Sequence, residues 1–195
     1  GSSLSLPYHN GLSTSASMED FTIVDANDDG STWSFDGNYN MVAYTANSSN
    51  AADDWFITPP INMQKGAAYK FSFDAVNDYP TERVAAAVGT DATAEAMTDI
   101  VIEPTEVTYQ PRRRTLSGTF RATEDGMRYF GIHAISDADC NHLYVDNLNI
   151  TEVSASAPDS PTDLVVTPGE KGATTAALCF TAPPNTSGGA VLTEN

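Results

Sequence analysis

The strongest constraint on the fold is a series of short strand-like segments separated by turn-forming residues. In the clearest of them, Tyr69–Ala75, apolar and polar side chains alternate, which is the pattern of a half-buried strand. Only residues 91–98 favour one or two helical turns, with Asp91 as the cap. Short strands at this spacing predict an antiparallel β-sandwich or jelly roll. The other predicted strands are Phe21–Val24, Trp33–Phe35, Met41–Tyr44, the part of Asp53–Ile61 that precedes Pro59-Pro60, Arg83–Gly89, Arg114–Phe120, Met127–Ala134 and Leu143–Ile150.

A change in composition at Ser154 predicts a domain boundary. Residues 154–161 are rich in Ser, Ala and Pro, as linkers are. We expect residues 1–153 to form one domain and residues 162–195 to be the N-terminal part of a second, immunoglobulin-like β-sandwich. Two strands are expected there, Leu164–Val166 and Ala176–Phe180, and about 35 residues cannot complete such a domain of about 100. The natural protein is therefore expected to continue.

The charge balance excludes several classes of partner. The 195 residues include 26 acidic and 9 basic ones, for a net charge of −17. This surplus argues against binding to nucleic acid or to an anionic membrane surface. No apolar run is long enough to span a bilayer, so no membrane insertion by this segment is expected. The two cysteines, Cys140 and Cys179, fall in different predicted domains, and low cysteine content with many small polar residues favours a bacterial exported protein.

A twelve-residue stretch that begins at Asp25 has the spacing of a calcium loop. Oxygen-bearing side chains occupy positions 1, 3, 5 and 12 (Asp25, Asn27, Asp29 and Asp36), and Gly30 stands at position 6, where such a loop turns sharply. Carboxylates this close repel one another unless a hard cation lies among them, and Ca²⁺ accepts six to eight oxygen ligands. The alternative is an Asx-rich turn between two strands. The flanking segments are not helical, so an EF-hand is not expected.

A second group of acidic residues is a candidate for another calcium site. In the strand Leu143–Ile150, Asp146 shares a face with apolar residues, where a carboxylate is costly unless it is paired or bound to metal. The alternative is an outer-face position or a partner Arg. Asp53 or Asp54, just before a strand, would complete such a site.

Catalytic motifs are missing from the sequence, whereas tyrosines suited to ligand contact are present. The three histidines lack metal-binding spacing, and there is no nucleophile-elbow motif or phosphate loop. Tyr39 and Tyr79 stand in turn-like segments and are candidates for sugar stacking, whereas Trp33 and Trp55 are expected in the core. The rival interpretation is a hydrolase with carboxylates in a cleft, for example Glu103 with Asp78.

Six motifs follow one another along the chain: Asp25–Trp33, Asp53–Ile61, Phe71–Ala75, Glu82–Thr90, Gly131–Asp137 and Leu143–Asn147. Together they resemble the cleaved-adhesin, or choice-of-anchor J, domain of bacterial surface proteins, over roughly residues 6–153. The resemblance implies a jelly-roll sandwich similar to MAM-type domains and carbohydrate-binding modules, with structural calcium and a role in adhesion. It also suggests a calcium ligand near the start of the domain, where this chain has Asn10. The tail from Ser160 to Pro168 resembles the opening of a fibronectin type III domain.

Taken together, these features predict a non-catalytic, calcium-stabilised adhesion module of an exported bacterial surface protein. Its partner would be an extracellular protein or a glycan, and its location extracellular or on the cell surface. The alternative is a carbohydrate-binding accessory module of a secreted protease or glycoside hydrolase. The expected contact loops are Asp36–Asn40, Asn77–Thr81 and Asp137–His142, because loops on a rigid sandwich carry function.

Overall fold

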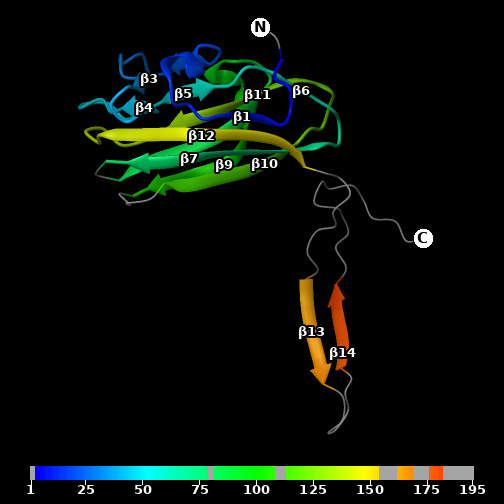
Figure 1. Cartoon of the computed structure of the whole chain (residues 1–195). Helices are drawn as coiled ribbons and strands as arrows, with labels where there is room; N and C mark the ends of the chain where they lie inside the picture. The colour runs from blue at the N-terminus through cyan, green and yellow to red at the C-terminus, as the bar shows by residue number, and fades with distance from the viewer. Residues whose placement is uncertain (1–2, 79–80, 109–112, 154–161, 169–175, 182–195) are drawn as a thin grey trace.

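The computed structural model describes residues 3–78, 81–108, 113–153, 162–168 and 176–181, and these are almost entirely β-strand (Figure 1). The helical segments within them are two short 3₁₀ turns, η1 (Ser15–Met18) and η2 (Ala94–Ala96). The second lies inside the predicted helical stretch but is capped by Thr93 rather than Asp91. The predicted all-β fold is confirmed.

Up to Val153 the strands form two antiparallel sheets of six strands each. The first sheet has the order β10-β7-β12-β4-β3, with β1 paired to β12. The second has the order β2-β5-β11-β8-β9, with β6 paired to β11. Neighbours in each sheet are mostly distant in the sequence, which is typical of a jelly-roll sandwich rather than a meander.

Most strands coincide with segments predicted from the sequence, whereas β1, β6 and β9 were not predicted. In the first sheet they are β1 (Tyr8–Asn10), β3 (Trp33–Asp36), β4 (Met41–Thr45), β7 (Ala68–Asn77), β10 (Arg114–Arg121) and β12 (His142–Val153). In the second they are β2 (Thr22–Asp25), β5 (Asp54–Ile57), β6 (Ile61–Met63), β8 (Glu82–Gly89), β9 (Met97–Val107) and β11 (Gly126–Ala134).

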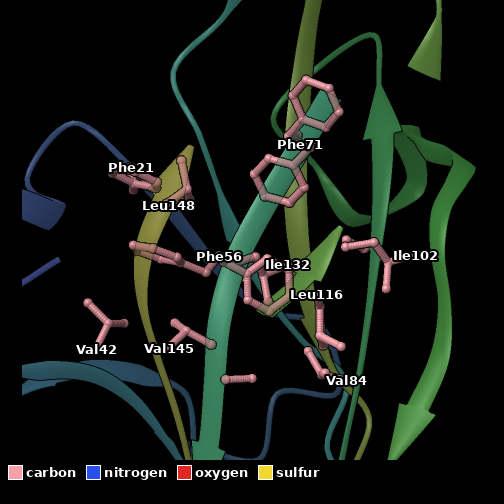
Figure 2. Close-up of a cluster of buried hydrophobic side chains, with 14 of the residues drawn as sticks. Phe21, Val42, Phe56, Phe71, Val84, Ile102, Leu116, Ile132, Val145 and Leu148 are labelled. Carbon is pink, nitrogen blue, oxygen red and sulfur yellow. The ribbon is translucent and has the colours of Figure 1, made fainter. Parts of the chain in front are cut away.

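The core lies between the two sheets and is built from the inward residues of each strand (Figure 2). In β7, Phe71 and Phe73 are fully buried while Lys70 is exposed, as the alternation predicts. The rings of Phe71 in the first sheet and Phe130 in the second stack with centroids 4.7 Å apart. Burial of such side chains contributes about 25 cal/mol per Å² and is the main stabilising term of the sandwich.

The segment after the sandwich contains two described strands, β13 (Thr162–Pro168) and β14 (Ala176–Thr181), which pair antiparallel. Both coincide with strands predicted from the sequence. The predicted linker, residues 154–161, and residues 182–195 lie outside the described residues. A fibronectin type III domain in this region stays a prediction.

Candidate functional site

The predicted calcium loop connects β2 to β3 and is closed by hydrogen bonds from its own backbone. The Asp25 carboxylate accepts the N–H groups of Asp29 at 3.2 Å and Gly30 at 2.8 Å. Gly30 adopts a φ of 82°, a conformation that glycine reaches without a steric penalty, so position 6 does make the sharp turn. These bonds are those of the Asx-rich turn, the alternative that the spacing left open.

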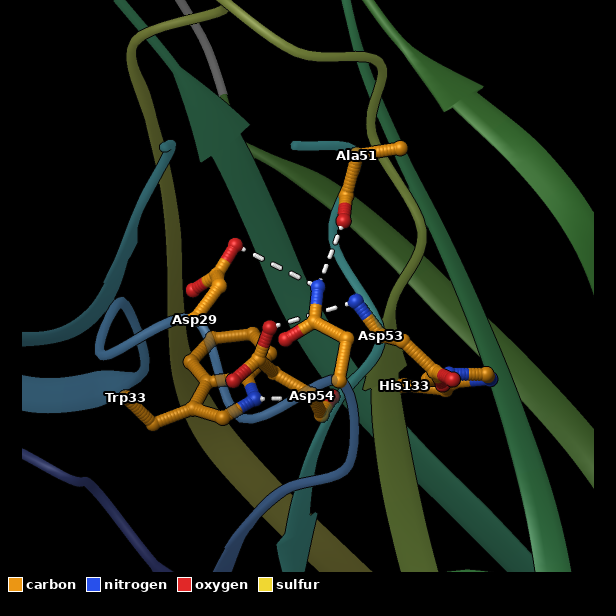
Figure 3. A network of polar contacts seen from close by, with 7 residues as sticks. Asp29, Trp33, Ala51, Asp53, Asp54 and His133 are labelled. Carbon is orange, nitrogen blue, oxygen red and sulfur yellow. Dashed lines mark hydrogen bonds and ion pairs between the residues drawn. The ribbon is translucent and has the colours of Figure 1, made fainter. Parts of the chain in front are cut away.

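Asn27 and Asp29 complete the loop and attach it to a neighbouring segment (Figure 3). The Asn27 amide donates to the Ala51 carbonyl at 2.7 Å and to the Asp29 carboxylate at 3.3 Å. The Asp29 carboxylate also accepts the Ser31 N–H at 2.8 Å. The structure therefore brings Asp25, Asn27 and Asp29 together, as predicted. Asp36, the predicted twelfth position, instead accepts the Asn38 N–H in the following turn.

Asn47 links this loop to a third segment. Its amide donates to the Asp29 carbonyl at 3.3 Å, and its own carbonyl accepts the Asp139 N–H at 2.9 Å. The loops 26–32, 46–53 and 135–141 thus meet at one end of the sandwich. Whatever stiffens one of these loops stiffens all three.

Beneath these loops lie two fully buried carboxylates, Asp54 of β5 and Glu82 of β8, which we call the buried acid pair. Glu82 Oε1 accepts the Asn141 N–H at 2.7 Å. The other oxygen of Glu82, Oε2, and Asp54 Oδ1 accept no hydrogen bond of normal geometry in the part of the chain that the structure describes, although the Thr32 hydroxyl lies close enough to Asp54 to act on its charge. Neither carboxylate forms an ion pair with a described Lys or Arg. Buried oxygens of this kind are costly unless a cation or water meets them.

The surroundings of Asp54 disfavour its ionised form. Burial raises the pKa of Asp54 to about 7, the Thr32 hydroxyl and the backbone N–H of Asp53 oppose that rise, and the charges of Asp25 and Asp29 add to it. The register places Asp25 opposite Asp54 on the paired strands β2 and β5. The charges of the loop carboxylates therefore disfavour ionisation of Asp54.

In calcium-free buffer we expect the free energy of unfolding to fall as the pH rises from about 4 to 7. Asp54 holds its proton in the folded protein up to about pH 7, whereas the unfolded chain releases it near 3.8. The folded state binds more protons in this window, so one such group lowers stability by up to about 1.4 kcal/mol per pH unit. Urea unfolding of the wild type and of Asp54→Asn across this range isolates the effect. Identical pH dependence in the two proteins would contradict it.

A calcium ion at this end of the sandwich would need ligands of several kinds. Within residues 3–78, 81–108 and 113–153, no group of three or more His, Cys, Asp or Glu side chains is placed to hold a metal by itself. Ca²⁺ also takes amide and backbone carbonyl oxygens, and the three loops supply these beside the buried acid pair. The unpartnered oxygens of Asp54 and Glu82 are the observation that favours a cation. Sequence reasoning named Asp54 only as an alternative to Asp53, and it missed Glu82.

The residues predicted for a second calcium site have separate partners. The Asp53 carboxylate contacts His133 Nε2 at 2.6 Å, and Asp146 pairs with Arg113 at 3.0 Å. Asn10 is engaged with its neighbours: its carbonyl oxygen accepts the Leu12 N–H and its amide donates to the Tyr8 hydroxyl and the Ser17 carbonyl. The structure does not gather Asp53, Asp146 and Asn10 into one ligand set. The partner Arg for Asp146 is the alternative that the sequence left open.

Tyr39 contributes to a second feature, an aromatic platform on the outer face of the first sheet, formed with Tyr144, His142 and Asp78. Tyr39 is 56% exposed, and its ring centroid lies 5.1 Å from that of Tyr144. His142 stacks on the same tyrosine at 5.6 Å. Asp78 Oδ2 accepts the Tyr144 hydroxyl at 3.2 Å and contacts His142 Nδ1 at 3.2 Å. The three predicted contact loops therefore meet here. Tyr79, the other predicted ligand-binding tyrosine, lies outside the described residues.

The electrostatics of the platform keep Tyr144 a hydrogen-bond donor. Burial, the charge of Asp78 and its hydrogen bond raise the pKa of Tyr144 well above the ordinary value, with smaller contributions from Asp36 and Tyr39. The phenol thus stays protonated and holds the Asp78 carboxylate in place. The platform presents one exposed ring beside a fixed carboxylate and an imidazole.

Both tryptophans are buried, but only Trp33 lies in the core, as predicted; the prediction of a core position for Trp55 is wrong. Trp33 is 2% exposed, lies in the core and donates its indole N–H to the Asp54 carbonyl at 3.1 Å. Trp55 is 7% exposed and belongs to a smaller cluster that includes Ala87 and Met97.

In the part of the chain that the structure describes, no helix is long and apolar enough to cross a bilayer.

Comparison with known proteins shows a shared fold but not a family. No protein-family model matches the chain. No curated protein matches it either. Among solved structures, it is similar to a cleaved adhesin domain of Lys-gingipain from Porphyromonas gingivalis, with a TM-score of 0.59 and 16% identity over 77% of this chain and 100% of that domain. A second cleaved adhesin domain of the same protein has a TM-score of 0.59 and 13% identity over 74% of this chain and 96% of that domain.

A carbohydrate-binding fold is also similar. The xylan-binding domain of Xyn10C from Paenibacillus barcinonensis has a TM-score of 0.53 and 14% identity over 76% of this chain and 95% of that domain. At such identities these likenesses establish the fold alone. They confirm, at that level, the resemblance to cleaved adhesin domains predicted from the motifs.

Proposed function

We propose that this chain is a non-catalytic binding module that recognises an extracellular glycan or protein through the aromatic platform. The observation that carries the proposal is the exposed ring of Tyr39 beside Asp78 and His142, where three loops of the sandwich meet. An exposed aromatic ring offers apolar area at low entropic cost, and adjacent polar groups fix the orientation of a ligand. Solved domains of the same fold are named as cleaved adhesin and xylan-binding domains, which supports the proposal.

A glycan suits the chemistry of the platform well. A sugar ring has an apolar face, which packs on tyrosine rings. Its hydroxyl groups form hydrogen bonds with carboxylates and imidazoles. Asp78 is held by two donors, so its orientation is fixed before a ligand arrives. A preorganised site of this kind loses less entropy on binding. We propose an exported, extracellular location, in keeping with the acidic composition and with this mode of recognition.

A catalytic role is less well supported. Two His–carboxylate pairs occur among the described residues, His133 with Asp53 and His142 with Asp78, and neither has a hydrogen-bonded Ser, Thr or Cys nucleophile. The carboxylates of the rival hydrolase interpretation come from different sheets, because Glu103 lies in β9 and Asp78 follows β7. Glycoside hydrolysis requires two carboxylates facing one scissile bond.

We further propose that calcium stabilises the loop end of the sandwich. The buried acid pair, Asp54 and Glu82, would supply the innermost ligands, and Asp25, Asn27 and Asp29 would supply outer oxygens from the loop. A bound Ca²⁺ would neutralise the repulsion among these carboxylates and connect the three loops. The unpartnered oxygens of the buried acid pair support this assignment.

Tyr39→Ala is expected to weaken glycan or protein binding at least about tenfold, a loss of 1.4 kcal/mol, because it removes the exposed ring of the platform. Glycan and extracellular-matrix arrays would identify ligands, and calorimetry would measure their affinity. Tyr39→Phe keeps the ring and should bind nearly as well as the wild type. Met127→Ala removes an exposed apolar side chain on β11 and serves as the control.

Two results would contradict the proposal. One is an affinity unchanged by Tyr39→Ala in a protein whose melting temperature is also unchanged. The other is turnover of a glycan or peptide that Asp78→Asn abolishes.

A further inference from the structure

A second concave surface lies on the outer face of the second sheet, away from the aromatic platform. We call it the outer groove. It encloses about 340 Å³, within the size range of small ligand sites. Its main lining residues are Trp55, Ala85, Ala87, Met97, Ile100 and His133.

Small residues in the two middle strands create the groove. Ala85 and Ala87 of β8 are paired with His133 and Gly131 of β11. A Cβ atom at Gly131 would lie 2.9 Å from the Trp55 ring, so glycine is needed for the indole to settle against the sheet. The ring of His133 then stacks on Trp55, with centroids 3.8 Å apart. The result is a floor of small side chains beside a wall formed by two stacked rings.

The opposite wall is an exposed apolar side chain. Ile100 of β9 is 59% exposed, and the register places it beside Ala87. The other exposed large apolar side chains among the described residues, Ile23, Tyr39 and Met127, are all less exposed. An exposed isoleucine over an apolar floor leaves a space that an apolar side chain would fill favourably.

Asp53 places a carboxylate at one wall of the groove. The Asp53 side chain is 51% exposed and contacts His133 Nε2 at 2.6 Å, where the ring forms the wall (Figure 3). Arg83 lies two residues before Ala85 on the same face of β8, and its register partner on β9 is Glu106. With a net charge of −17 for the chain, this surface attracts cations and repels acidic partners.

We propose that the outer groove binds a basic peptide segment that inserts one large apolar side chain between Ile100 and the Trp55–His133 stack. A neighbouring Lys or Arg of that peptide contacts Asp53. Charge complementarity selects a protein partner with a basic surface rather than a neutral glycan. This interaction is separate from the aromatic platform, so the module can hold a glycan and a protein at once, on opposite sheets.

The test uses three capped peptides, Lys-Trp-Lys, Glu-Trp-Glu and Lys-Ala-Lys, added to the ¹⁵N-labelled protein. Lys-Trp-Lys is expected to shift the amide signals of Ala85, Ala87 and His133. The other two peptides should bind at least tenfold more weakly, because one has the wrong charge and the other has no side chain to insert. Equal binding of all three, or no binding of Lys-Trp-Lys at millimolar concentrations, would overturn the proposal.

Four variants test whether the Lys-Trp-Lys peptide binds in the outer groove. Ala85→Leu fills the floor of the groove from the outer face. Ile100→Ser removes the exposed wall, and because Ile100 is mostly exposed the fold should be preserved. Each variant should weaken Lys-Trp-Lys binding at least tenfold. Asp53→Asn should weaken it several-fold. Tyr39→Ala, on the opposite sheet, should leave it unchanged. Binding that survives both Ala85→Leu and Ile100→Ser would overturn the assignment to this groove, while loss of binding in Tyr39→Ala would move the site to the platform.

Discussion

Chelation of calcium with EDTA is expected to lower the melting temperature by roughly 5–10 °C. A ligand present at one hundred times its Kd stabilises the folded state by about 2.7 kcal/mol, and one kcal/mol corresponds to about 2–4 °C for a domain of this size. The physical reason is the buried acid pair: Asp54 Oδ1 and Glu82 Oε2 accept no hydrogen bond of normal geometry among the described residues, and the charges of Asp25 and Asp29 act on Asp54. Differential scanning calorimetry with calcium and with EDTA measures the change.

Variants separate a specific ion from a general salt effect. Glu82→Gln keeps the shape of the side chain and its contact with the Asn141 N–H but removes a charge. In this variant calcium should no longer raise the melting temperature. Asp125→Asn serves as the matched control, because Asp125 accepts a backbone N–H in an exposed turn away from the buried acid pair. If the wild type melts at the same temperature with and without EDTA, calcium does not stabilise the module.

Replacing Gly118 by alanine is expected to destabilise the sandwich by about 3 kcal/mol, the upper end of typical overpacking costs. Gly118 lies in β10 and faces β9, and a Cβ atom built there would stand 1.7 Å from the Val101 carbonyl oxygen. That oxygen belongs to the backbone and cannot rotate away as a side chain would. β9 and β10 would have to move apart where the edges of the two sheets meet. Ile102 of β9 is part of the buried core there.

Urea unfolding measures this loss, and Gly37→Ala supplies the control. A Cβ atom at Gly37 would meet only the Phe35 ring, at an ordinary contact distance of 3.9 Å. That substitution should change the free energy of unfolding by less than about 0.5 kcal/mol. If Gly118→Ala were as stable as Gly37→Ala, the close approach of β9 and β10 would be wrong. Because β9 also carries Ile100, Gly118→Ala should weaken peptide binding in the outer groove as well.

The acidic loop end and the outer groove have a common origin in the order of the strands. β5 and β8 both pair with β11, so the inward residues Asp54 and Glu82 come to the same end of the core. The outward residues of the same strands, Trp55 and Ala85, line the groove. Because side chains alternate along a strand, β5 and β8 each contribute one residue of the buried acid pair on the inner face and one lining residue of the outer groove on the outer face.

β9 is the longest strand that the sequence did not predict, because its composition is unusual for β-structure. β9 contains Asp99, Glu103 and Glu106 together with Pro104, a residue that favours strand edges. Its apolar residues do not alternate regularly, since its pairing with β8 has several register shifts. A strand at the edge of a sheet tolerates such irregularity, because one side makes no ladder. β1 and β6 were missed for a different reason, as three residues are too few for a periodic signal.

The sequence by itself determined what depends on neighbouring residues. The alternation in β7, the turn at Gly30 and the hydrogen bonds of Asp25 to the next few residues are all local, so pattern and spacing predict them. The tertiary structure alone decided which distant residues meet: Glu82 with Asn141, His142 with Asp78, and His133 with Asp53, pairs separated by 59, 64 and 80 positions. The reason is that strand order in a jelly roll is set by the packing of the two sheets around a common core, and many orders are compatible with one pattern of alternation.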